Sequence, residues 1–105
     1  MQLSSVKTVT IAFDGTACTV SPPELMVKKS DEVFFDNQTP AEISVLCSED
    51  KIFGLPGQFA VGAEGKEPHV VGDCPPGWYP YAVYCRCIEG YARAASMPII
   101  IVTRD

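Results

Sequence analysis

The chain consists of short stretches in which apolar and polar residues alternate, separated by breaks rich in Gly, Pro, Asn and Asp. In the first stretch Val9, Ile11 and Phe13 alternate with Thr and Ala, and Asp14-Gly15 follows as a turn signal. Successive side chains of an extended strand point to opposite faces. The alternation therefore predicts β-strands with one buried face, the pattern of an all-β sandwich or barrel.

The same alternation recurs along the rest of the chain. Beyond residues 9–13 it predicts strands at residues 17–20, 25–27, 33–37, 43–47, 58–61, 69–71, 78–87 and 98–103. Turn residues separate these stretches, most strongly at 73–77, and residues 88–96 are expected to form a loop or one helical turn. Because no long helix, linker or repeat is present, we expect residues 1–105 to form a single domain.

The apolar positions of these strands also predict the core. Side chains at alternate positions share one face of a strand, as Ile43, Val45 and Cys47 do. Applied to the other strands, the same rule predicts a core that two packed sheets enclose. The side chains expected to be mainly buried are Ile11, Phe13, Val27, Val33, Phe35, Val45, Val83 and Ile101.

Two segments make the pattern more specific. The first is Pro22-x-x-Leu25-x-Val27-x-x-Ser30-Asp31-x-Val33-x-Phe35-x-Asn37, and the second is Tyr81-x-Val83-Tyr84-Cys85 with Met97 and Ile99-x-Ile101 following. Together they resemble the cupredoxins, or blue-copper proteins, with Ser30 in place of the family's turn glycine; residues 48–70 are not covered. The resemblance implies a cupredoxin-like Greek-key β-sandwich of about seven or eight strands, with Asn37 near Cys85.

The resemblance also implies where copper ligands should stand. A type 1 copper site needs two imidazoles, one thiolate and a weak axial methionine. Cys85 and Met97 match the thiolate and the methionine, although Met97 lies farther from Cys85 than the family's compact loop allows. The first histidine is expected at about Glu42 or Ile43, and the second within two to four residues of Cys85. Those later positions hold Cys87, Ile88 and Glu89.

The only histidine of the chain, His69, lies outside both ligand segments. We therefore expect no type 1 copper site and no bound cofactor. Copper remains the alternative, because Cys85-Arg86-Cys87 offers two thiolates, and thiolates bind Cu(I) or Zn(II). In that case the candidate metal ligands are Cys85, Cys87, Met97, Cys47 and His69.

The chain contains five cysteines: Cys18, Cys47, Cys74, Cys85 and Cys87. In an exported protein they predict at least one disulfide and one free thiol. The pairing stays open, except that Cys85 and Cys87 are poor partners unless the strand ends at Cys85, because on an extended strand their Cα atoms lie about 6.5 Å apart. The family resemblance implies that Cys47 approaches Cys85. We expect a periplasmic or extracellular protein, although no signal peptide precedes the first strand.

Charge and hydropathy narrow the range of partners. The net charge of −5 argues against nucleic acid, which binds to basic surfaces. No apolar run has the length of a transmembrane helix. We expect an unknown protein partner, and the acidic net charge favours a basic one. The aromatic residues after position 77 form either a binding platform or part of the core.

An immunoglobulin-like sandwich is the rival fold, because 82–85 resembles its second cysteine strand and Cys18 lies at a suitable distance. That fold requires a core Trp between the two cysteines, where Phe34 and Phe35 stand instead. No catalytic motif is present, so we expect no enzyme. Three functions remain: a binding or structural module that has lost type 1 copper, a copper-binding or electron-transfer protein using Cys85, Cys87 and Met97, or a thiol-disulfide redox protein.

Overall fold

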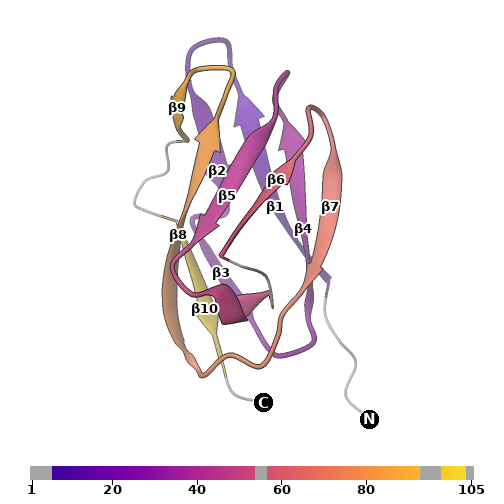
Figure 1. Ribbon diagram of the computed structural model, residues 1–105, viewed down its shortest axis with the longest axis vertical. Helices are drawn as coiled ribbons and strands as arrows, with labels where there is room; N and C mark the ends of the chain where they lie inside the picture. Colours follow the sequence, from indigo (N-terminus) through magenta and orange to yellow (C-terminus); the bar gives the residue numbers. More distant parts are fainter. Residues whose placement is uncertain (1–5, 54–56, 93–97, 104–105) are drawn as a thin grey trace.

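Two β-sheets packed face to face form the molecule. The computed structural model describes residues 6–53, 57–92 and 98–103. One sheet has the order β2-β1-β4-β7, and the other has the order β3-β10-β8-β5-β6, with β9 paired to β8 (Figure 1). The strands are β1 (Val6–Phe13), β2 (Cys18–Ser21), β3 (Glu24–Val27), β4 (Glu32–Gln38), β5 (Ile43–Cys47), β6 (Gln58–Val61), β7 (Lys66–Val70), β8 (Gly77–Cys85), β9 (Gly90–Tyr91) and β10 (Ile99–Val102).

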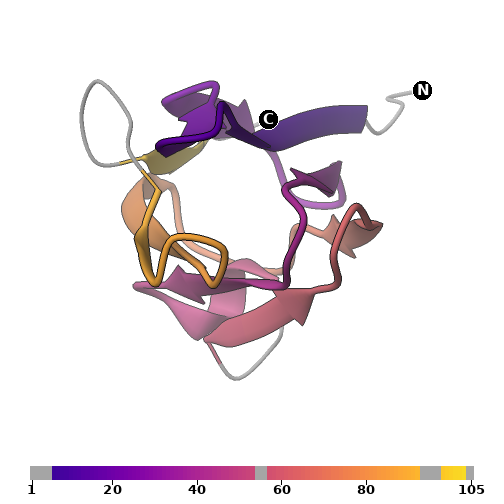
Figure 2. The same cartoon turned by 90° about the horizontal axis from the view of Figure 1, so that it is seen from above.

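The pairing mixes parallel and antiparallel strands. β1 and β2 form an antiparallel hairpin, whereas β1 with β4 and β3 with β10 are parallel pairs, so the chain crosses repeatedly between the sheets. Seen from above, the strands surround a central space that the core side chains fill (Figure 2). This arrangement confirms the predicted all-β sandwich, with more strand segments than the expected seven or eight, since the described residues contain ten.

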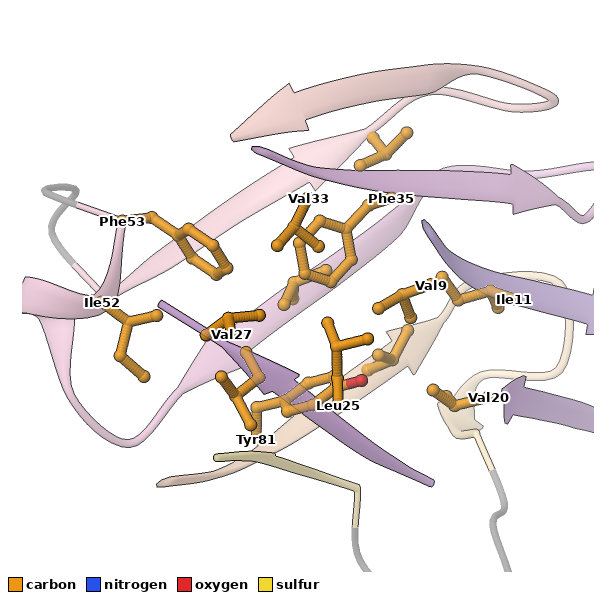
Figure 3. Packing of buried hydrophobic residues seen from close by; sticks show 14 of the residues in the cluster. Val9, Ile11, Val20, Leu25, Val27, Val33, Phe35, Ile52, Phe53 and Tyr81 are labelled. Carbon is orange, nitrogen blue, oxygen red and sulfur yellow. The ribbon is translucent and has the colours of Figure 1, made fainter. Parts of the chain in front are cut away.

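The core is built around Phe35 on β4, which is fully buried (Figure 3). Its ring meets Phe53, Phe59 and Tyr81 edge to face, with centroid separations of 5.7, 5.1 and 6.3 Å. These edge-to-face contacts suit the quadrupoles of aromatic rings. The short 3₁₀ helix Asp50–Ile52 adds the buried Ile52 beside them.

Six of the eight side chains predicted to be buried are buried: Ile11, Val27, Val33, Phe35, Val45 and Val83. Phe13 and Ile101 are half-buried instead. For Ile101 the predicted register of β10 is wrong by one residue, because Ile100 and Val102 face the core. The run 99–102 is apolar at every position, so its periodicity could not distinguish the two faces.

Asn37, at the end of β4, joins the two sheets through its side-chain amide. Its Nδ2 donates to the backbone oxygens of Ala41 (2.9 Å), Val61 (3.2 Å) and Gly62 (2.9 Å). Its Oδ1 accepts from the backbone N–H and the hydroxyl of Thr39 at 2.9 and 2.7 Å. Val61 and Cys85 both pair with Ile43, so Asn37 and Cys85 lie at the same end of the sandwich.

Candidate functional site

Three cysteines meet at this same end of the sandwich. Cys18 begins β2, directly after the β1–β2 turn, whereas Cys85 ends β8 and Cys87 lies in the β8–β9 turn. These two turns lie at the same end of the molecule (Figure 1). The Sγ atoms of Cys18 and Cys87 are 3.3 Å apart, and the thiol of Cys85 also interacts with that of Cys18. We call Cys18, Cys85 and Cys87 the thiol cluster.

The β1–β2 turn fixes the position of Cys18. Asp14 Oδ1 accepts hydrogen bonds from the backbone N–H groups of Thr16 and Ala17, both at 2.8 Å, as turn carboxylates commonly do. Gly15 has a φ of 99°, a backbone conformation that favours glycine. The turn thereby pairs Cys18 with the end of β1 and points its side chain into the sandwich, where it is fully buried.

The β8–β9 turn fixes the other two thiols. Cys85 pairs with Ile43 on one side and with Gly90 on the other, and its side chain is fully buried. The turn beyond it is held by two backbone hydrogen bonds, from Ile88 to Cys85 (3.3 Å) and from Glu89 to Arg86 (3.2 Å). Cys87 lies inside this turn and is half-buried.

Burial favours the neutral form of the Cys18 and Cys85 thiols. It raises the pKa of Cys18, and hydrogen bonds to the other two thiols raise it further. Burial also raises the pKa of Cys85, although its hydrogen bond with Cys18 acts in the opposite direction. Because the thiolate is the nucleophile and the metal ligand, the two buried members are weakly reactive until they lose a proton.

The sequence pattern does not predict Cys18 at this site. It identifies Cys18 only as one of five cysteines that could form a disulfide and as part of the rival fold, and 69 residues separate Cys18 from Cys87. A signal was nevertheless present: Asp14-Gly15 predicts a turn, and a hairpin there puts the start of the next strand opposite the end of the first. The missing information was which strand of the facing sheet lies opposite that hairpin.

The expectation that Cys47 approaches Cys85 is wrong. Cys47 pairs with Tyr81, and Cys85 lies four residues farther along β8, about 13 Å at the rise of a strand. Both face the core, but toward opposite ends of it. Burial raises the pKa of Cys47 to about 11. The buried Tyr81 hydroxyl beside it has no hydrogen-bond partner among the described residues.

His69 lies on the edge strand β7, and its ring packs against the aromatic rings of the core. Its ring lies 3.9 Å from that of Phe59, centroid to centroid, and its Nε2 is 3.9 Å from the carboxylate of Glu67. Burial lowers the pKa of His69, and Glu67 partly opposes that shift. His69 pairs with Val33 near the start of β4, whereas Asn37 near the end of that strand marks the thiol cluster's end. The histidine and Cys85 are therefore far apart.

The two segments expected to supply imidazoles hold other chemistry. Ile43 is fully buried on β5, and Glu42 forms an exposed ion pair with Arg86 at 3.6 Å. Met97 lies outside the described residues. Among the residues that the structure describes, no three His, Cys, Asp or Glu side chains form a group that could hold a metal ion. Neither segment therefore supplies an imidazole at the position where the type 1 pattern requires one.

A second feature is an exposed apolar row on the outer face of the larger sheet. Ile101 on β10 pairs with Met26 on β3 and with Trp78 on β8, so the three side chains lie next to one another on one face. Met26 is 58% exposed and Trp78 is 69% exposed. We call Met26, Ile101 and Trp78 the apolar row. In the part of the chain that is described, no helix is both long and apolar enough to cross a membrane.

The fold is similar to that of solved cupredoxin structures. No family model matches the chain, and no curated protein matches it. Among solved structures it is similar to reduced auracyanin from Roseiflexus castenholzii, with a TM-score of 0.61 and 15% identity over 98% of this chain and 100% of that one. A purple cupredoxin from Nitrosopumilus maritimus matches with a TM-score of 0.59 and 13% identity over 92% and 99% of the two chains.

Larger proteins contain the same architecture. A multicopper oxidase from Pseudomonas thermotolerans matches 97% of this chain with a TM-score of 0.62 and 14% identity, over 30% of its own length. At these identities the likeness concerns the arrangement of strands alone. The residues at the thiol cluster and the apolar row must therefore carry any functional conclusion.

Proposed function

From the premise that the chain has a cupredoxin-like fold, we propose that it is a binding or structural module without a type 1 copper site. One observation carries this proposal: the chain has a single histidine, and that histidine packs against Phe59 on the edge strand β7, opposite Val33, rather than beside Cys85. Type 1 copper requires two imidazoles beside the thiolate. Even a rearrangement that moved His69 would leave the second imidazole missing. The module needs neither a cofactor nor a catalytic role.

The apolar row is the binding surface that we assign to this module. Trp and Met are enriched at protein interfaces and are frequent among the residues that carry binding energy. The net charge of −5 favours a partner with a basic rim around an apolar centre. The proposed occupant is therefore a protein whose basic surface surrounds one exposed apolar patch. A periplasmic or extracellular location is part of the proposal, because five cysteines in a short chain are typical of exported domains.

A second candidate function is favoured by one specific contact. Cys18 and Cys87 approach within 3.3 Å, beside Cys85. Thiolates are ligands for Cu(I), so a copper-binding or electron-transfer role would use Cys85 and Cys87, with Met97 as a further soft ligand. A thiol-disulfide redox role would use the same sulfur atoms without metal.

Addition of Cu(II) to reduced protein tests the first proposal. We expect no intense visible absorption band, and after desalting we expect copper well below one equivalent per chain. A strong band that disappears in Cys85→Ser would overturn the proposal, because it would require a thiolate–Cu(II) site. One equivalent of copper bound without colour, and lost in Cys87→Ser, would instead establish the Cu(I) alternative.

A photo-crosslinking residue tests the docking surface separately. Placed at Trp78 in cells that produce the protein, it should capture one defined partner, and Met26→Asp should abolish the capture. The matched control is the same residue at Tyr91, which is 60% exposed but lies on β9. Equal capture at both positions, or capture unaffected by Met26→Asp, contradicts the assignment.

A further inference from the structure

The thiol cluster lies between the two sheets. Cys18 belongs to the sheet of β1, β2, β4 and β7, whereas Cys85 and Cys87 belong to β8 and the turn that follows it in the other sheet. A covalent bond there would join the sheets at the end where the family resemblance places copper. We propose that Cys18 and Cys87 form a disulfide under oxidising conditions and that Cys85 remains a buried thiol beside it. This inference does not depend on the proposed function.

The distance between the two sulfur atoms supports this pairing. A disulfide has an S–S length of about 2.05 Å, so the atoms now 3.3 Å apart must move little more than 1 Å. Cys87 can make this movement, because its turn is held by two long backbone hydrogen bonds, at 3.2 and 3.3 Å. Cys18 is fixed by the ladder that pairs it with Phe13. The bond would therefore form by a movement of Cys87 toward Cys18.

Cys85 competes for Cys18 but is placed less favourably. Cys85 pairs with a strand on each side, so its backbone cannot shift toward Cys18. Its side chain is fully buried, so an external oxidant cannot reach its sulfur atom. Strand β8 ends at Cys85, so Cys87 lies in the turn beyond it, and the short sulfur–sulfur contact that Cys87 makes there is with Cys18. Cys87 is half-buried and is the accessible member. Access and backbone freedom both favour Cys87 as the partner of Cys18.

The other two cysteines lie too far away to compete. Cys47 pairs with Tyr81, four residues along β8 from Cys85. Cys74 precedes β8, whose first residue is Gly77, and lies beside Tyr79 at the opposite end of that strand. Both should remain thiols when the bridge forms.

A low-molecular-weight disulfide such as oxidised glutathione completes the chemistry. The Cys87 thiolate attacks one glutathione sulfur, forms a mixed disulfide and releases one glutathione thiolate, which takes up the proton. The Cys18 thiolate then attacks the Cys87 sulfur and releases the second glutathione thiolate, which is also protonated. Two protein thiols are oxidised, and one glutathione disulfide is reduced to two thiols. The raised pKa of Cys18 makes the second step faster as the pH rises toward that pKa.

The bridge would have two consequences for the molecule. It closes a loop of 69 residues in sequence, and a long closed loop restricts the unfolded chain. The oxidised protein should therefore be more stable than the reduced one. It would also consume two of the three thiols of the cluster, which leaves Cys85 as the remaining free thiol of that cluster.

Oxidation of the purified, fully reduced chain with glutathione disulfide tests the proposal. Alkylation under denaturing conditions should count five thiols before and three after. Non-reducing peptide mapping should link the peptides of Cys18 and Cys87, and the Tm should rise by about 10 °C. Five remaining thiols, a stable glutathione adduct at Cys87, or a link through Cys85, Cys47 or Cys74 would overturn it.

Matched variants separate this bond from its competitors. Cys87→Ser should keep all four of its thiols and show no rise in Tm on oxidation. Cys47 lies away from the thiol cluster, so Cys47→Ser should still lose two thiols on oxidation. Its Tm should rise by the same amount as that of the unaltered chain. A loss of two thiols in Cys87→Ser, with the same rise in Tm as in the unaltered chain, would show that the bond forms without Cys87 and would contradict the inference. Mapping of the unaltered chain decides the pairing if a variant fails to fold.

Discussion

Single polar and ionisable residues in this molecule have clear structural tasks. Asn37 is fully buried. Its amide nitrogen donates to three backbone oxygens, and its amide oxygen accepts from the backbone N–H and the hydroxyl of Thr39. Buried polar groups are costly unless they are hydrogen-bonded, so a residue with this many partners is difficult to replace. The sequence pattern predicts that Asn37 ends a strand, but it does not predict that the Asn37 amide reaches across to Val61 on β6.

Replacement of Asn37 should measure this task. Asn37→Ala leaves its carbonyl partners without their donor, and we expect a loss of about 2–4 kcal/mol in the free energy of unfolding. Gln38→Ala is the control, because Gln38 is exposed and its amide donates to the carboxylate of its near neighbour Asp36. It should change stability by less than about 0.5 kcal/mol. Urea unfolding of the three proteins gives the comparison, and equal losses would contradict the role assigned to Asn37.

Buried thiols should also make the reduced protein sensitive to alkali. The pKa of Cys47 rises from its ordinary 9.0 to about 11 on folding. Below pH 9 the thiol is neutral in both states; between these two values the unfolded chain releases its proton while the folded chain keeps it. The free energy of unfolding must therefore fall with rising pH across this window.

Unfolding in urea with reductant, at a series of pH values from 8 to 11, measures this slope. Cys47→Ala should reduce the slope without abolishing it, because burial also raises the pKa of Tyr81 and of Cys18. A slope unchanged in Cys47→Ala would show that another group carries the effect.

At the scale of elements, the register of a strand could be predicted where one face of the strand is apolar and the other is polar. β4 alternates cleanly, with buried and half-buried residues in turn, and its register was correctly predicted. β10 is apolar throughout, so the wrong face was assigned to the core. β7 was expected to begin at His69 but begins at Lys66, because an edge strand that pairs only with β4 tolerates polar residues and Pro68.

Two neighbouring substitutions test the register of β10. Ile100→Ala removes a fully buried side chain and should cost about 2–5 kcal/mol, the range for large-to-small changes in a core. Ile101→Ala removes a half-buried side chain on the outer face and should cost less than about 1 kcal/mol. The two variants have the same chemistry and differ only in the face, so denaturant unfolding decides the register. The reverse order would restore the register that the sequence pattern suggested.

At the scale of the whole molecule, the sandwich could be predicted but the site could not. Alternation and turn residues are local signals, and they specify strands and sheets. The thiol cluster depends on which hairpin of one sheet lies over which turn of the other, and Cys18 and Cys87 are 69 residues apart. Local patterns carry no information on that juxtaposition. The proposal that the chain lacks type 1 copper rests on the sequence itself, because it needs only a count of histidines.

The apolar row gives the last prediction, because the fold should not need it. Trp78 and Met26 lie on the outer face of the larger sheet, while Val27 and Tyr81 on the same strands face the core. Trp78→Ser and Met26→Ser should each change the free energy of unfolding by less than about 0.5 kcal/mol, as exposed substitutions usually do. Because Trp78 is the only Trp and is 69% exposed, its emission should shift little on unfolding, so circular dichroism is the appropriate probe. Losses as large as that of Ile100→Ala would mean that the row stabilises the sheet, and the docking surface would lose its support.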